Sequence, residues 1–147
     1  MKRLLFFVLA ALFATSAAAA DPSLVDGVSG APLVWSDWVA KRGPVAVLVW
    51  ASWAPEAKSV VGDYRAFARA SREAGLHLVL LDVQESLGDG RQALAGSGIS
   101  WIHDRHGGLL KLYRVIKVPS VIVVAEDGSL LQRLDATPEA LTTGVSR

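Results

Sequence analysis

The pattern of apolar and polar residues changes character in the middle of the chain. Residues 45–50 form an unbroken, valine-rich apolar run behind Gly43 and Pro44, which is typical of a strand buried on both faces. From Pro55 to residue 71 the apolar positions instead fall at helical spacing, and a first-turn proline is tolerated because its missing N–H would have no partner there. The pattern predicts a central strand that runs into a helix across residues 52–54.

Two further apolar patterns predict the rest of a sheet. Residues 76–83 form a second buried run after the helix stop signal at Gly75, and strand, helix and strand of these lengths predict a parallel pair with a right-handed crossover. The runs 121–124 and 130–134 flank an Asp-Gly turn at residues 127–128, which indicates an antiparallel hairpin at one end of the sheet.

Shorter elements complete an α/β arrangement with helices flanking a central mixed sheet. A short strand at residues 32–35 precedes a helical turn with Ser36 as its N-cap, and Thr137 and Pro138 open the last helix. Further short elements are predicted as helices at 91–95 and 109–115 and as an apolar return at 101–103.

The N-terminus has the pattern of a secretory signal peptide. Lys2 and Arg3 precede an apolar stretch at residues 4–13, and the small residues 18–20 before Asp21 suit cleavage. The alternative is an uncleaved anchor, since the apolar and small residues nearly reach membrane-spanning length. We expect a signal peptide over 1–20, a lead-in or linker over 21–31 and one domain over 32–147. The protein is then exported, periplasmic or extracytoplasmic, and contacts a membrane only if the signal stays uncleaved.

Composition narrows the possible chemistry. Lys2 and Arg3 are the only charged residues of the leader, so 13 Lys and Arg would remain against 14 Asp and Glu, a net charge of −1 that does not favour a nucleic-acid partner. The chain has no cysteine and its single methionine is Met1. These absences exclude a disulfide, thiol exchange, an iron–sulfur cluster and sulfur ligands for copper in the mature chain, and we expect no cofactor.

The strand-to-helix junction resembles the active-site segment of thioredoxin-like proteins, and most closely the exported TlpA and ResA type. That family carries an apolar strand, W-A-x-W-C-x-x-C and a long helix, and residues 50–53 read Trp-Ala-Ser-Trp. Ala54 and Ala57 stand where the family has its two cysteines. The resemblance implies a thioredoxin-like fold and a thiol-disulfide oxidoreductase, whereas the two alanines imply a redox-inactive, cysteine-free member.

A second mark of the family is a cis-proline just before the first strand of the hairpin. Pro119 stands at that place, so the resemblance, which spans residues 32–141, implies a cis peptide bond after Val118. A proline that simply opens a strand is the alternative. TlpA and ResA relatives often place a proton-transferring glutamate where this chain has Val60. Loss of that acid with both thiols favours natural decay of the site over laboratory replacement.

No other catalytic group is evident in the sequence. Ser52 has no histidine and aspartate placed to activate it, and Glu56 at the helix start is best explained as a charge favoured by the helix dipole. His103 and His106 are weak metal candidates near Asp104, because a stable zinc site needs three or four ligands. The simpler interpretation is a polar loop with two surface histidines, and His77 is expected in the interior or at a strand edge.

The resemblance also implies a surface on which relatives hold an extended polypeptide. We call it the active-site groove, and it comprises Trp53, Pro55, Glu56, Val118 and Pro119. Trp53 is either an exposed anchor or a half-buried packing residue. The expected function is binding of a polypeptide or an envelope protein partner without redox chemistry. The alternative is an enzyme, a TlpA-like thiol-disulfide oxidoreductase that acts only with a cysteine-bearing partner.

Overall fold

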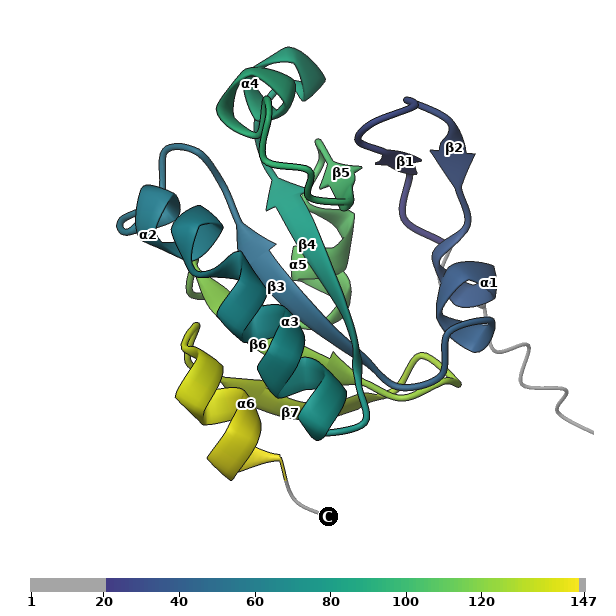
Figure 1. Ribbon diagram of the computed structural model, residues 1–147. Helices are drawn as coiled ribbons and strands as arrows, with labels where there is room; N and C mark the ends of the chain where they lie inside the picture. Colours follow the sequence, from purple (N-terminus) through teal and green to yellow (C-terminus); the bar gives the residue numbers. More distant parts are fainter. Residues whose placement is uncertain (1–20, 146–147) are drawn as a thin grey trace, which may run out of the picture.

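The structure is a computed structural model that describes residues 21–145, and its centre is a seven-stranded mixed sheet in the order β2-β1-β5-β4-β3-β6-β7 (Figure 1). The strands are β1 (Leu24–Asp26), β2 (Pro32–Leu33), β3 (Val45–Trp50), β4 (His77–Val83), β5 (Trp101–Asp104), β6 (Ser120–Val124) and β7 (Leu130–Leu134). The helices are α1 (Trp35–Ala40), α2 (Ala57–Gly62), α3 (Tyr64–Glu73), α4 (Leu87–Ala93), α5 (Gly108–Leu112) and α6 (Pro138–Gly144). The α/β class predicted from the sequence is confirmed.

The apolar sequence of β3 is explained by its position inside the sheet. It pairs in parallel with β4 and antiparallel with β6, and all six of its residues are buried. Because successive side chains of a strand point to opposite faces, Val45, Val47 and Val49 enter one hydrophobic cluster, whereas Ala46, Leu48 and Trp50 enter the other. The predicted parallel pair and the β6–β7 hairpin are both confirmed.

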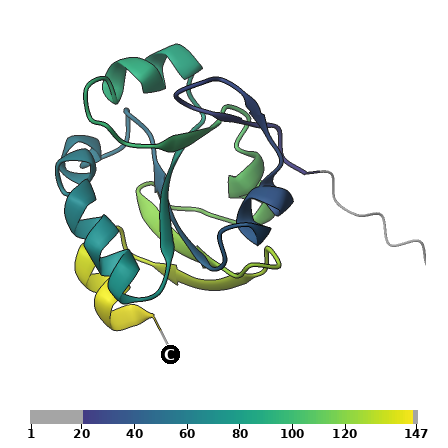
Figure 2. The same ribbon diagram turned by 45° about the vertical axis from the view of Figure 1, so that its right-hand side comes forward.

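Helices cover both faces of the sheet (Figures 1 and 2). Trp35 of α1 and Leu109 of α5 pack into one cluster, while α2, α3 and α6 pack into the other through residues such as Phe67 and Leu141. Burial on both faces is what the continuous apolar runs of β3 and β4 require. The two layers of helices leave the C-terminal ends of β3 and β4 at one edge of the domain, where the candidate site lies.

Several local predictions were wrong. The helix expected from Pro55 begins two residues later, because Glu56 is left-handed at φ 61° and cannot continue a right-handed turn. The same helix divides into α2 and α3 at Asp63. Ser36 lies inside α1 with Val34 at the N-cap. The helix expected at 91–95 is α4, which begins earlier because the Ser86 hydroxyl accepts the Asp89 N–H as an N-cap.

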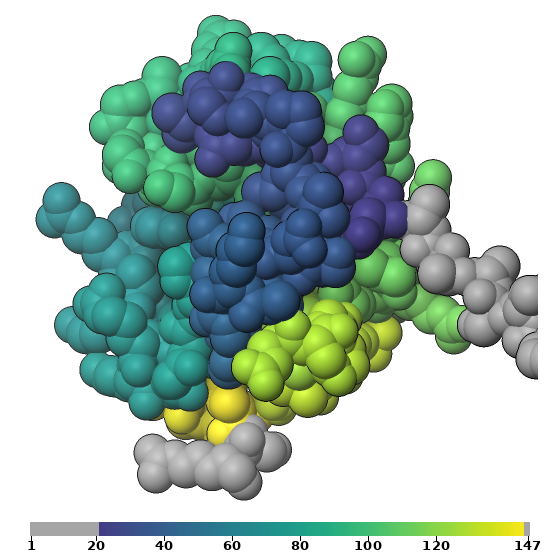
Figure 3. Space-filling view, turned by 90° about the vertical axis from the view of Figure 1, so that its right-hand side faces the viewer, coloured from purple at the N-terminus to yellow at the C-terminus, as the bar shows by residue number. Residues whose placement is uncertain are grey.

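The lead-in segment is an ordered part of the sheet. Strand β1 pairs with β5, and Gly27 lies so close to the Trp101 ring that an added Cβ would come within 2.1 Å of it. Figure 3 shows this segment in purple toward the top and right of one face, with α1 in blue at the centre and the yellow-green β6–β7 hairpin below it. The predicted signal peptide lies outside the described residues. No helix within residues 21–145 has the length and apolar character needed to cross a membrane.

Candidate functional site

The junction between β3 and α2 is held by a buried tryptophan and a tight turn. The Trp50 indole N–H donates to the Ala57 carbonyl at 2.9 Å, which fixes the first turn of α2 against the end of β3. Between them, Ala54 N donates to the Ala51 carbonyl at 3.1 Å and Ala57 N to the Ala54 carbonyl at 3.2 Å. Two consecutive turns therefore carry the chain from strand to helix.

The two cysteine positions of the resemblance are now packing residues. Ala54 and Ala57 are only 7% and 6% exposed, and Val60, at the family's acid position, is 4% exposed. Methyl and isopropyl groups supply neither a nucleophile nor a proton. Within residues 21–145, and in the whole sequence, there is no cysteine that could replace them. The junction therefore holds no group that performs thiol chemistry.

The loop before β6 lies alongside this junction. The Val118–Pro119 peptide bond is cis, as the resemblance implies. The β3–β6 register pairs Val49 with Ser120, so the preceding Pro119 lies beside the end of β3 at Trp50. Val118 is half-buried and packs against the cluster that contains Ala54.

The other residues of the active-site groove are exposed but separated. Trp53 is 56% exposed, which favours the surface interpretation over the packing one, whereas Trp35 and Trp50 are each 2% exposed. Pro55 and Glu56 are exposed in the turn before α2. Glu56 lines a hollow toward α6, and Trp53 lines a different pocket beside α4, so the two side chains serve opposite sides of the turn.

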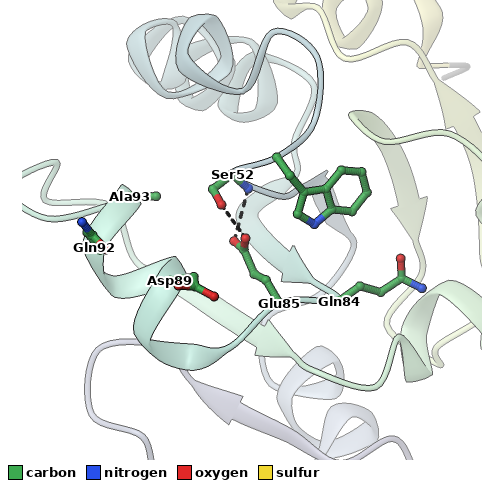
Figure 4. A pocket seen from close by; sticks show the side chains of 7 residues that line it. Ser52, Gln84, Glu85, Asp89, Gln92 and Ala93 are labelled. Carbon is green, nitrogen blue, oxygen red and sulfur yellow. Dashed lines mark hydrogen bonds between the residues drawn. The ribbon is translucent and has the colours of Figure 1, made fainter.

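The pocket beside α4 contains a carboxylate that the sequence analysis missed. The Ser52 hydroxyl donates to Glu85 Oε2 at 2.5 Å, and the Ser52 backbone N–H donates to Glu85 Oε1 at 3.2 Å (Figure 4). The parallel register pairs Trp50 with Asp82, so the residues that follow each strand lie side by side. Glu85 is thus an acidic partner of Ser52 that the sequence analysis did not consider, and no histidine or aspartate is hydrogen-bonded to Ser52 in the described residues.

Asp82 lies behind Glu85 at the end of β4 and is fully buried. Burial, and next the Glu85 carboxylate that faces it, raise the pKa of Asp82 to about 9, so this carboxyl carries a proton at neutral pH. Its Oδ2 lies 3.1 Å from His103 Nδ1, and burial lowers the pKa of His103. The pair is therefore a hydrogen bond between neutral groups, not an ion pair. An aspartate inside the apolar run 76–83 was the sequence signal for this site.

We call the hollow around Glu85 the acidic pocket. Its volume is about 620 Å³, and it is lined by Ser52, Trp53, Gln84, Glu85, Asp89, Gln92 and Ala93. Gln84 is left-handed at φ 60°, an uncommon conformation for a residue other than glycine, at the point where the chain leaves β4. Strained residues of this kind gather at functional sites, and Gln84 and Glu56 flank the junction on its two sides.

The histidines do not form a metal site. His103 is buried in β5, contrary to the expected surface loop, whereas His106 is exposed beyond the strand end. Asp104 instead caps α5, where its two oxygens accept the Gly108 and Leu109 N–H groups, each at 2.8 Å. In residues 21–145 no three His, Cys, Asp or Glu side chains are placed to hold a metal ion. His77 is exposed at the first position of β4.

Comparison with known proteins supports the fold. No protein-family model matches the chain, and no curated protein sequence matches it significantly. Solved structures do match: StoA from Bacillus subtilis has a TM-score of 0.62 at 19% identity, covering 84% of this chain and 97% of its own. Thioredoxin from Wuchereria bancrofti has a TM-score of 0.61 at 22% identity, with coverages of 86% and 89%.

A third similar structure is a secreted Mycobacterium tuberculosis disulfide oxidoreductase homologous to Escherichia coli DsbE. Its TM-score is 0.60 at 14% identity, covering 82% of this chain and 90% of that one. Identities this low carry the fold and not the activity. The chain is thus a protein of thioredoxin-like fold whose structural neighbours include disulfide oxidoreductases, and it has no cysteine.

Proposed function

We propose that this protein is an exported thioredoxin-fold protein that has no thiol redox activity and binds a polypeptide or an envelope protein partner through the active-site groove. The observation that carries the proposal is that the junction of β3 and α2 has no thiol and no other reactive side chain. Ala54 and Ala57 occupy the cysteine positions and are buried, while the exposed Trp53 remains beside them. The chemistry of the site is gone, but an aromatic surface of the kind that anchors interfaces is retained.

The position of the loop before β6 supports polypeptide binding. Val118 is half-buried next to the junction, so its backbone lies where an extended chain could pair with it, as in strand-addition complexes. Ile116, two residues before Val118, is 98% exposed and lines a hollow together with Val115 and Ile122.

Export is supported by two observations. Residues 1–20 have the charge and apolar pattern of a secretory signal peptide. One of the structural neighbours is described as secreted. We therefore place the protein in an extracytoplasmic compartment such as the periplasm. A mature chain without cysteine is also unaffected by the oxidising conditions there.

A second candidate function is favoured by the structural neighbours. A TlpA-like thiol-disulfide oxidoreductase role remains open if a partner protein supplies the cysteines and this chain only positions the substrate. The two candidates differ in one property: the second requires that the bound partner carry an accessible cysteine pair, and the first does not.

A pull-down from envelope extract tests both candidates. The mature protein is the bait, the Trp53→Ala, Pro119→Ala double variant is the comparison, and Leu131→Ala removes an equally exposed apolar residue of β7 as a control. A partner retained by the wild type and the control but lost from the double variant supports binding at the groove. Equal retention by all three places binding elsewhere. Insulin reduction by the purified wild type would contradict the loss of redox activity.

A further inference from the structure

The charged side chains that line the acidic pocket are all negative, and one exposed aromatic ring lies beside them. Glu85 and Asp89 bring two carboxylates to it, Trp53 adds an indole that is 56% exposed, and no basic side chain is among the described residues that line it. Figure 4 shows Glu85 reaching toward Ser52 with Asp89 beside it on α4. The fork of a guanidinium can bond carboxylates in pairs while its plane stacks on an aromatic ring.

A second feature behind the pocket is independent of this lining. Asp82 is fully buried, and its Oδ1 has no hydrogen-bond partner in the described part of the chain. The carboxylates of Glu85, Asp89 and Asp104 lie close enough to raise its pKa, and the first two line the pocket. Buried polar atoms nearly always have a partner, so this oxygen is an unpaired polar atom next to the pocket.

The neighbouring surface continues the pocket as an apolar hollow. A second cavity of about 350 Å³ shares Ser52 and Ala93 with the acidic pocket and adds the apolar residues Trp50, Ala57 and Val61. Lys58 is the basic residue on its rim. The cleft between α2 and α4 thus offers an apolar part beside a carboxylate part, which matches a long side chain with an aliphatic stem and a cationic head.

We propose that the acidic pocket binds an arginine side chain of the polypeptide that the groove holds. The guanidinium lies between Glu85 and Asp89 and against the Trp53 ring, and the stem extends along the cleft toward Ala57. This inference rests on the proposed function and names its specificity: the bound segment carries an arginine next to the residues that pair with Val118. Lysine binds more weakly because its compact ammonium cannot bond both carboxylates in a plane.

Titration with N-acetyl-arginine N-methylamide tests the pocket directly, with the citrulline analogue as its uncharged isostere. The readout is the two-dimensional ¹⁵N–¹H spectrum of the mature protein. Saturable shifts at the Trp53 indole and at the amides of residues 84–93 are expected for arginine and not for citrulline. Glu85→Gln, which can still accept the Ser52 hydroxyl, should weaken the affinity about tenfold, the scale of one charge-assisted hydrogen bond.

Matched controls separate specific binding from general attraction. Glu73→Gln removes the same charge at the end of α3, away from the pocket, and should leave the affinity unchanged. Lys58→Ala should strengthen binding by removing the one basic side chain on the adjoining rim. Equal binding of citrulline, or equal effects of Glu85→Gln and Glu73→Gln, would overturn the proposal.

A peptide library distinguishes this failure from failure of the proposed function. Peptides enriched on the wild type should contain arginine, and Glu85→Gln should lose that enrichment. Enrichment of peptides without any basic preference would refute the arginine pocket while polypeptide binding stands. Conversely, if no peptide is enriched although the arginine derivative binds at Glu85, the pocket stands and polypeptide binding fails. Thermal unfolding of each variant confirms that it is folded.

Discussion

The junction of β3 with α2 and the acidic pocket beside it are adjacent, yet they have opposite chemical character. The junction is apolar and sealed, with Ala54 and Ala57 nearly inaccessible. The pocket is open and charged, with Glu85 bonded to Ser52 and a protonated Asp82 behind it. The two regions are only two residues apart in the sequence: Ser52 lines the pocket, and Ala54 packs into the core at the junction.

This difference shows that losing a reactive group does not make its surroundings inert. At the junction Ala54 and Ala57 are buried, and backbone hydrogen bonds hold the turn between the strand and the helix. Apart from Ser52, the polar groups of the pocket come from the segment after β4 and from α4, so they do not depend on the residues at positions 54 and 57. The pocket can therefore have a selective role of its own, whatever the junction does. The predictions below test each side of the comparison.

The largest effect should come from returning thiols to the junction. Ala57 N bonds the Ala54 carbonyl across three residues, so the two Cα atoms lie within the roughly 7 Å of a tight turn and within disulfide reach. The Ala54→Cys, Ala57→Cys variant should form an internal disulfide on treatment with oxidised glutathione. Alkylation of free thiols followed by mass spectrometry measures it, with Ala54→Cys alone as the control. Two free thiols after oxidation would mean that the junction no longer has a thiol-site geometry.

Much of the junction and of the fold could be predicted from sequence, because these depend on local patterns. The buried run 45–50 splits into two faces by strand alternation alone, and the Asp-Gly turn at 127–128 fixes the β6–β7 hairpin. The same is true of Thr137, whose hydroxyl accepts the Ala140 N–H exactly where a helix N-cap was expected. Elements that are determined by their own residues can be predicted without knowledge of tertiary contacts.

The acidic pocket could not be predicted, because it depends on how separate segments meet. Ser52 and Glu85 are 33 residues apart, and only the pairing of Trp50 with Asp82 brings them together. The left-handed Gln84 turns the chain after β4, and a glutamine in the sequence does not predict a left-handed conformation. The later start of α2 was not predicted either. Glu56 is left-handed, although a proline followed by an acid favours a regular helix start at this place.

The next largest effect concerns the packing behind the pocket. Gly90 of α4 lies against Asp82 and Trp101, and an added Cβ would come within 2.4 Å of Asp82 Oδ2. Gly90→Ala should therefore destabilise the protein by about 2 kcal/mol, within the range of overpacked cores. Gly88→Ala in the same helix meets only Ser86 Oγ at 3.8 Å and should gain up to about 1 kcal/mol from helix propensity. Chemical denaturation measures both, and similar values for the pair would mean that α4 does not close over Asp82.

A smaller, pH-dependent effect should follow from Asp82→Asn. The native carboxyl keeps its proton to about pH 9, whereas the unfolded carboxyl releases it near 3.8, so the wild type loses stability as pH rises between these values. Asparagine removes this loss, so the variant should gain on the wild type from near pH 4 upward, by at most about 1.4 kcal/mol per pH unit up to pH 8. Glu126→Gln in the exposed hairpin turn is the control. A constant difference across urea melts at pH 4, 6 and 8 would contradict the buried, protonated Asp82.

The smallest change in stability is expected for Trp53, and it distinguishes a binding surface from a structural one. Because its ring is 56% exposed, Trp53→Ala should alter the free energy of unfolding by no more than about 0.5 kcal/mol. Trp35→Ala provides the contrast, since Trp35 is 2% exposed and its indole N–H donates to the Tyr113 hydroxyl at 2.7 Å; its loss should cost about 3–5 kcal/mol. If Trp53→Ala leaves stability intact but lowers arginine affinity several-fold, its ring acts on a ligand. A destabilisation close to that of Trp35→Ala would instead make Trp53 part of the packing, and the groove would lose its anchor.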